Sequence, residues 1–127
     1  MSGEQFILYA LAAAVLLLYG RRMYLRMSIN QYTPTSLAKR IDEGNVILLD
    51  VRTSQERSAS SIKGSLHIPI NDLVRDREKL EKHKSKEIVC YCQTGSRSLV
   101  AAARLKRYGF TVGNLKGGMA EWNFFYR

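Results

Sequence analysis

Two short apolar runs constrain the fold of this chain more than any other feature of its sequence. Residues 46–49 read Val-Ile-Leu-Leu and residues 88–91 read Ile-Val-Cys-Tyr, and neither run alternates with polar residues. Such continuity is typical of strands covered on both faces, as in a parallel sheet. Thr33-Pro34 has the residues that start a helix, and residues 98–108 have apolar positions at helical spacing. We therefore predict an α/β domain with a central, mostly parallel sheet flanked by helices. Shorter strands are expected at residues 66–68 and 111–112.

The N-terminus is a different kind of sequence. Residues 6–19 contain no charged or strongly polar residue, and Arg21, Arg22 and Arg26 follow them. A cleavable signal peptide has its positive charge before the apolar run, so this order argues against one. The run gives about 21 Å of helix, short of the roughly 30 Å hydrocarbon core. Neighbouring residues can extend it if the arginines reach the interface.

We expect this segment to be a single membrane-spanning helix that contacts lipid through residues 6–25. A buried core helix and an anchor lying in the membrane plane are the alternatives. The arginines on its C-terminal side predict that the rest of the chain lies on the cytoplasmic side of the cell inner membrane. The expected division is an anchor with its basic juxtamembrane segment, residues 1–27, and a soluble domain, residues 28–127.

The formal net charge of +9 restricts the partners. The charges are dispersed, and no stripe of basic residues interleaved with aromatics marks a nucleic-acid surface. We expect no nucleic-acid partner. A cationic surface of this kind instead suits anionic lipid or small anionic substrates.

Both cysteines of the chain lie in one stretch, Cys-Tyr-Cys-Gln-Thr-Gly-Ser-Arg-Ser at residues 90–98. A structural zinc site needs four ligands at typical spacings, and His67 and His83 do not form a second pair to match the cysteines. We expect no metal and no cofactor. A Cys90–Cys92 disulfide would close a strained ring, so Cys90 is interpreted as a small hydrophobe in the strand.

Cys92 lies where an apolar strand ends and a helix begins near Arg97. In a tight strand-to-helix turn, backbone N–H groups can converge on one point and bind an anion. Gly95 permits a backbone conformation that other residues resist. A cysteine at such a turn would have a depressed pKa, and Arg97 would add a cation and a fork of donors. On these local grounds, an activated nucleophile and an ordinary turn after a buried cysteine remain equally open.

Four motifs, in order over residues 32–122, resemble those of rhodanese-like sulfurtransferase domains. They are Val-Cys-Tyr-Cys-Gln-Thr-Gly-Ser-Arg-Ser at 89–98, Leu-Leu-Asp-Val-Arg-Thr-Ser-Gln-Glu at 48–56, Ile-Lys-Gly-Ser-Leu-His-Ile-Pro-Ile at 62–70 and Leu-Lys-Gly-Gly-Met-Ala-Glu-Trp at 115–122. The resemblance implies a rhodanese-like sandwich, and single-domain members with a membrane helix are known in bacteria. It also implies that Cys92 accepts sulfane sulfur from a small anionic donor, thiosulfate or a persulfide, and passes it to cyanide, a thiol or a protein.

The resemblance assigns roles to the surrounding residues. The donor and the persulfide would be held by the loop, namely Gln93, Thr94, Gly95, Ser96 and Arg97. Asp50 and Arg52 would brace that loop, with Arg52 paired to Glu56. Related dual-specificity phosphatases have a loop one residue longer, so this spacing favours attack on sulfur.

The sequence departs from the family pattern at two places. Arg57 stands where the family often has an aromatic residue, and Ser60-Ser61 stand where it often has Gly-His. Both departures lie outside the catalytic loop, so they concern local packing or the choice of partner and not the nucleophile. The alternative function is a membrane-tethered protein-binding or redox- or sulfur-sensing module without turnover, and retention of Cys92 and Arg97 argues against it.

Overall fold

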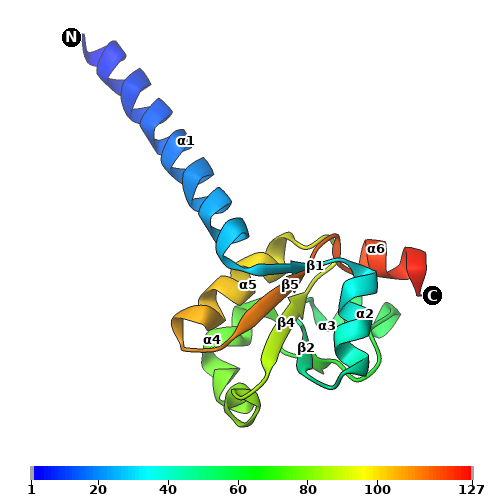
Figure 1. The fold of residues 1–127 in the computed structure, drawn as a ribbon. Coiled ribbons are helices and arrows are strands. Elements are labelled where there is room, and N and C mark those ends of the chain that lie inside the picture. Colours follow the sequence, from blue (N-terminus) through cyan, green and yellow to red (C-terminus); the bar gives the residue numbers. More distant parts are fainter. Residues whose placement is uncertain (1, 127) are drawn as a thin grey trace.

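The computed structural model describes residues 2–126 and consists of a long N-terminal helix that projects from an α/β domain (Figure 1). The elements are α1 (Gly3–Ser28), β1 (Asn30–Tyr32), α2 (Pro34–Asp42), β2 (Val46–Asp50), α3 (Ser54–Ala59), β3 (Leu66–His67), η1 (Ile70–Asp72), α4 (Leu73–Asp76), η2 (Arg77–His83), β4 (Glu87–Tyr91), α5 (Ser96–Arg107), β5 (Val112–Leu115) and α6 (Gly118–Phe125).

The five strands form one parallel sheet in the order β1-β5-β4-β2-β3. The two apolar runs are β2 and β4, which lie side by side with Leu49 opposite Cys90. The predicted parallel α/β architecture is therefore confirmed. Because parallel strands all end at the same edge, the loops after β2, β4 and β5 meet there.

Side chains of β4 alternate between two apolar cores, one on each face of the sheet. Cys90 packs with residues of α4, η2 and α5, including Leu73, Leu80 and Leu105. Tyr91 packs on the opposite face with residues of α2 and α6. Burial on both faces explains why this strand has no polar alternation.

The helix predicted at Thr33-Pro34 has the expected start. The Thr33 hydroxyl accepts a hydrogen bond from the Ser36 amide at 3.2 Å, and Pro34 is the first helical residue. Strand β1, directly before it, was not predicted, because its residues are polar and it forms only by pairing with β5. The last strand also extends further than expected, to Leu115.

Helix α1 contains a 22-residue span, Gly3–Tyr24, that is long and apolar enough to cross a membrane. At about 1.5 Å per residue its length is about 33 Å, close to the hydrocarbon thickness. The domain buries none of its most apolar window, which contradicts the alternative of a buried core helix. Its C-terminal end is held to α5 where Lys106 Nζ donates to the Ser28 carbonyl oxygen at 2.9 Å.

Candidate active site

The turn between β4 and α5 places Cys92 beside the N-terminus of a helix. Gly95 has a φ of +96° and precedes the first residue of α5. A Cβ atom at Gly95 would lie 3.1 Å from the Gly117 amide nitrogen and 3.2 Å from the Leu115 carbonyl oxygen. Two separate constraints therefore require glycine at position 95: the left-handed backbone conformation and the close approach of the chain after β5.

Two donors face the Cys92 sulfur. The Gly95 amide donates to Sγ at 3.1 Å, and the Ser98 hydroxyl lies 3.3 Å from it. Burial raises the pKa of the Cys92 thiol, but hydrogen bonds from the Ser98 hydroxyl and from the amides of Ser98, Thr94 and Gly95 outweigh it. The net pKa lies below the ordinary value, so the thiolate is favoured.

A buried polar chain extends from the sulfur to β1. The Asn114 Nδ2 atom donates to the Gly95 carbonyl oxygen at 3.1 Å and to Gln31 Oε1 at 2.9 Å. Asn114 Oδ1 lies 2.5 Å from Ser98 Oγ and competes with the sulfur for the single hydroxyl hydrogen of Ser98. Both Ser98 and Asn114 are buried. Sequence reasoning did not single out Ser98, Asn114 or Gln31; for Ser98 the available signal was a hydroxyl in the first turn of the helix that follows the nucleophile.

Cys90 behaves differently from Cys92, although only Tyr91 separates them. It is fully buried in the core, and burial raises its pKa to about 12. Its interpretation as a small hydrophobe in the strand is confirmed.

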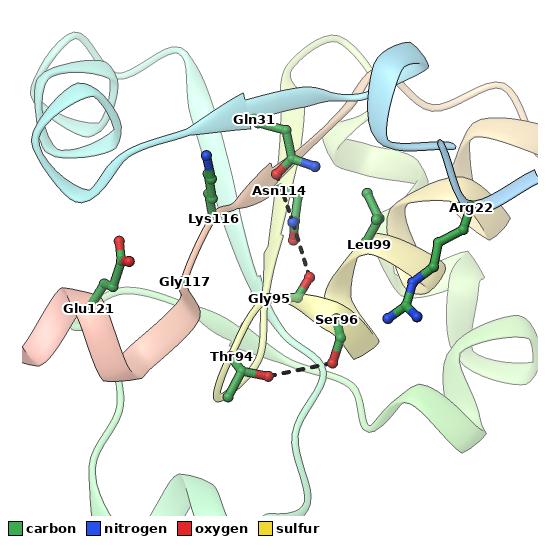
Figure 2. A pocket seen from close by; sticks show the side chains of 10 residues that line it. All are labelled: Arg22, Gln31, Thr94, Gly95, Ser96, Leu99, Asn114, Lys116, Gly117 and Glu121. Atoms are coloured by element: carbon green, nitrogen blue, oxygen red, sulfur yellow. Dashed lines mark hydrogen bonds between the residues drawn. The ribbon is translucent and has the colours of Figure 1, made fainter. Parts of the chain in front are cut away.

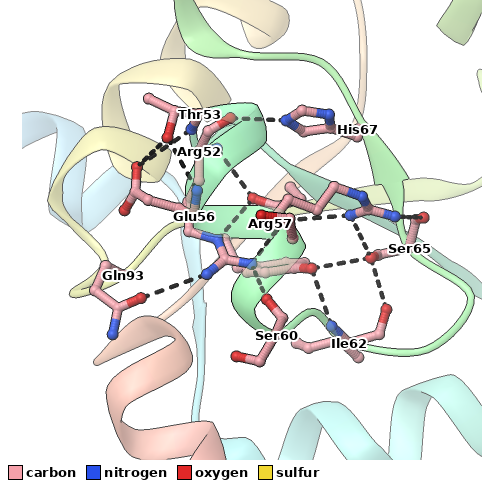
Figure 3. A network of polar contacts seen from close by, with 12 residues as sticks. Arg52, Thr53, Glu56, Arg57, Ser60, Ile62, Ser65, His67 and Gln93 are labelled. Carbon is pink, nitrogen blue, oxygen red and sulfur yellow. Dashed lines mark hydrogen bonds and ion pairs between the residues drawn. The ribbon is translucent and has the colours of Figure 1, made fainter.

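The Asp50 and Arg52 side chains form a buried pair, and the Arg52 side chain points toward Gln93 of the loop (Figure 3). Arg52 Nε and Nη2 donate to the two Asp50 oxygens at 3.0 and 2.9 Å. Arg52 Nη1 reaches Gln93 Oε1 at 3.4 Å, and Nη2 also donates to the Ser60 carbonyl oxygen at 2.6 Å. Burial raises the pKa of Asp50, but the hydrogen bonds from Arg52 and Arg57 lower it by more than burial raises it. The net pKa of Asp50 is therefore below its ordinary value. These contacts reach the loop from the end of β2.

The expected pairing of Arg52 with Glu56 is wrong. Asp50 occupies the Arg52 guanidinium, and Glu56 instead accepts from Arg97 through both oxygens, at 2.8 Å each. The physical reason is the capping box of α3. Glu56 Oε1 accepts a hydrogen bond from the Thr53 amide at 3.2 Å, which turns the carboxylate toward the loop between β4 and α5. The Arg97 hydrogen bond lowers the pKa of Glu56 to about 2. Arg97 is thus tied to α3, and its role as an anion ligand stays a prediction.

Arg57, at the position where the sequence departs from the family pattern, takes part in the same network. Its Nη1 atom lies 3.2 Å from Asp50 Oδ2 and 3.0 Å from Ser65 Oγ, and its Nη2 atom donates to the Ser65 carbonyl oxygen at 2.8 Å. The departure therefore adds a second cation to Asp50 and links the residue before β3 to the end of β2.

The first residues of α6 bind the backbone of the catalytic loop. The Met119 amide donates to the Cys92 carbonyl oxygen at 2.9 Å, and the Ala120 amide donates to that of Gln93 at 3.0 Å. A Cβ atom at Gly118 would lie 2.4 Å from the Cys92 carbonyl oxygen. Gly118 therefore permits the helix end to approach the loop, which explains one glycine of the C-terminal motif.

A cavity of about 480 Å³ opens beside the loop (Figure 2). It is lined by Arg22, Gln31, Thr94, Gly95, Ser96, Leu99, Asn114, Lys116, Gly117 and Glu121. Of the predicted loop ligands, Thr94, Gly95 and Ser96 line this cavity, whereas Gln93 and Arg97 turn to Arg52 and Glu56. Among residues 2–126 no group of three or more His, Cys, Asp or Glu side chains is placed to hold a metal ion.

The model of the rhodanese-like domain family matches residues 33–124. The chain belongs to the rhodanese-like family. Two relatives cover most of this rhodanese-like domain. A putative sulfurtransferase, YtwF of Bacillus subtilis, is 32% identical over 76% of this chain and 92% of its own length. A sulfurtransferase of Allochromatium vinosum is 35% identical over 74% of this chain and 88% of its own length.

Solved structures show the same fold. The rhodanese-related protein of Thermoplasma volcanium superposes with a TM-score of 0.70 at 28% identity, over 77% of this chain and 95% of that one. A protein from Rhodopseudomonas palustris described as a possible tyrosine phosphatase superposes with a TM-score of 0.72 at 25% identity, over 80% of this chain and 84% of that one. The rhodanese-like sandwich expected from the motifs is confirmed.

Proposed function

We propose that this protein is a membrane-anchored sulfurtransferase that moves sulfane sulfur through a persulfide on Cys92. The family and the relatives named sulfurtransferases support sulfur transfer in general. The observation that carries the specific mechanism is the Gly95 amide, which donates to Cys92 Sγ at 3.1 Å, together with the Ser98 hydroxyl, whose oxygen lies 3.3 Å from the sulfur. They favour the thiolate, which is the reactive form of a cysteine nucleophile.

In the first half-reaction, the Cys92 thiolate attacks the outer sulfur of thiosulfate. The S–S bond of the donor breaks, sulfite leaves with the electron pair, and Cys92 becomes a persulfide. The Gly95 amide, which donates to Sγ at 3.1 Å, would stabilise negative charge on the sulfur, as preorganised donors do in other anion-stabilising sites. Cys92 is fully buried, so residues that cover its sulfur must shift before a donor reaches it.

In the second half-reaction, a nucleophilic acceptor attacks the outer sulfur of the persulfide. Cyanide gives thiocyanate, and a thiolate gives a new persulfide. In both cases the Cys92 thiolate is the leaving group, so its depressed pKa favours this step as well. Neither half-reaction needs a metal or an external oxidant.

Thiosulfate:cyanide sulfur transfer by the full chain in detergent tests this proposal. Cys92→Ser should abolish thiocyanate formation, because a serine hydroxyl cannot form a persulfide. Cys90→Ala is the matched control, since that residue fills the core, and it should retain most of the activity. Equal activity in wild type and Cys92→Ser would overturn the mechanism.

We further propose that α1 spans the inner membrane once, with residues 28–127 on the cytoplasmic side. The span Gly3–Tyr24 and the arginines at its C-terminal end, Arg21 and Arg22, support this topology, because these arginines would lie at the cytoplasmic interface. Added protease should digest the domain in inverted membrane vesicles and leave it intact in sealed spheroplasts. The reverse pattern would place the domain outside, and extraction by carbonate would indicate an in-plane anchor.

A further inference from the structure

The anchor helix supplies one wall of the cavity beside the catalytic loop. Arg22 of α1 and Gln31 of β1 line the cavity together with Ser96, and the Arg22 side chain reaches toward Ser96 (Figure 2). Both Arg22 and Gln31 lie before residue 33, where the match to the family model begins. This wall is therefore built by the part of the chain outside the matched domain.

The cavity is much larger than thiosulfate requires. Its volume is about 480 Å³, within the range of roughly 300–1,000 Å³ that holds organic ligands. Thiosulfate is a single tetrahedral anion. The size of the cavity therefore fits an organic substrate that lies between the loop and α1. Cys92 itself does not line the cavity, so such a substrate meets the sulfur from the side of Thr94, Gly95 and Ser96 when the loop shifts.

The charges of the cavity favour an anionic substrate. Arg22 and Lys116 are exposed cations on different walls, and among residues 2–126 neither forms an ion pair. Glu121 is the one carboxylate among the lining residues, and it folds back on its own helix: a Cβ atom at Gly117 would lie 2.6 Å from its Oε2 atom. The two cations are thus left to face a ligand.

We propose that Arg22 is a specificity-determining residue for the sulfur acceptor, and that this acceptor is a small organic thiol bearing a carboxylate. The inference rests on the proposed function, because it names the substrate class of the same reaction. The acceptor thiolate attacks the outer sulfur of the Cys92 persulfide. A new S–S bond forms, the bond to Cys92 Sγ breaks, and the transferred sulfur keeps the proton that the persulfide anion took from water after sulfite left. The products are the acceptor persulfide and the Cys92 thiolate.

Two acceptors of equal chain length separate the charge effect from thiol reactivity. These are 3-mercaptopropionate, which carries a carboxylate, and 3-mercaptopropanol, which does not. The full chain is placed in phosphatidylcholine nanodiscs, so that no anionic lipid competes for the arginine. Sulfite release at saturating thiosulfate reports each turnover. Arg22→Ala is compared with Arg21→Ala, which removes the same charge from the neighbouring residue of α1 that does not line the cavity.

Arg22→Ala should raise the KM for 3-mercaptopropionate by about two- to fivefold, as expected for one solvated charge pair. It should leave kcat and the KM for 3-mercaptopropanol unchanged, and Arg21→Ala should leave all these values unchanged. Equal KM changes for both thiols, or equal effects of both variants, would overturn the inference.

Cyanide as acceptor distinguishes failure of the inference about Arg22 from failure of the proposed sulfurtransferase function. If the wild-type protein transfers sulfur to cyanide while the Arg22 variant shows no selectivity between the thiols, only the inference about Arg22 fails. If the wild-type protein transfers no sulfur to cyanide or to either thiol, the proposed function fails and this inference falls with it.

Discussion

Both terminal nitrogens of Arg97 donate to the two carboxylate oxygens of Glu56, each at 2.8 Å. This bidentate pair ties the first turn of α5 to α3, and the same turn of α5 carries Ser98. Geometry of this kind restricts both side chains more than a single ion pair does. The Glu56–Arg97 pair therefore positions the helix that presents the Ser98 hydroxyl to the sulfur.

Glu56→Gln should destabilise the fold in a pH-dependent way. The pKa of Glu56 is lowered from 4.5 to about 2, so its stabilising contribution is fully present above pH 4.5 and is lost as the pH falls toward about 2. Thermal unfolding in detergent should show a lower midpoint for the variant at neutral pH and converging midpoints under acid conditions. A difference that stays constant over this pH range would contradict the role of the charged pair.

Ser98→Ala should shift the pH dependence of sulfur transfer. Removing the hydroxyl removes one donor to the Cys92 sulfur, which raises the pKa of the thiol and moves the rise of kcat/KM to higher pH. Pre-steady-state sulfite release measured across pH gives this midpoint. Ser58→Ala is the control, because its hydroxyl is exposed and contacts only the Gln55 carbonyl oxygen among the contacts described. An unshifted midpoint in Ser98→Ala would show that the hydroxyl does not act on the sulfur.

Gly118→Ala should disturb the loop beyond the cost of backbone strain alone. Both Gly118 and Gly64 have positive φ, but only at Gly118 would a Cβ atom meet backbone, at 2.4 Å from the Cys92 carbonyl oxygen. Gly64→Ala should cost about 1–2 kcal/mol of stability. Gly118→Ala should cost about 2–5 kcal/mol, since overpacking adds to the strain, and should also lower sulfur transfer. Urea unfolding of both variants in detergent measures this difference, and equal costs would contradict it.

Asp50→Asn should be among the most destabilising single changes near the site. Asp50 and Arg52 are both buried, and removing the carboxylate leaves the guanidinium without its charged partner. Breaking a buried pair in this way costs about 3–5 kcal/mol. Asp76→Asn breaks a pair with the exposed Arg75 and should cost little. If the two variants unfold at the same urea concentration, Asp50 does not brace the fold.

The elements that could be predicted are those whose own residues determine them. The β2 and β4 runs are apolar on both faces, and the start of α2 contains its own capping residues. Strand β1 could not be predicted, because Asn30 and Gln31 are polar and exposed and the strand depends on β5 for its pairing.

The ion pairs near the site could not be predicted for the same reason: they depend on contacts that only the folded chain makes. Arg52 was expected to pair with Glu56, but Asp50 binds its guanidinium instead and is buried with it. Arg97, the true partner of Glu56, lies 41 residues away in sequence, so only the tertiary fold brings them together. Likewise, Asn114 reaches the loop only because β5 lies beside β4.

The central claim is that Cys92 carries the sulfur. Intact-protein and peptide mass spectrometry of the full chain after treatment with thiosulfate tests it most directly. We predict a gain of one sulfur atom on the peptide that contains Cys92, localised to that residue by fragmentation and removed by cyanide. No added sulfur, or sulfur added on Cys90 instead, would contradict the account.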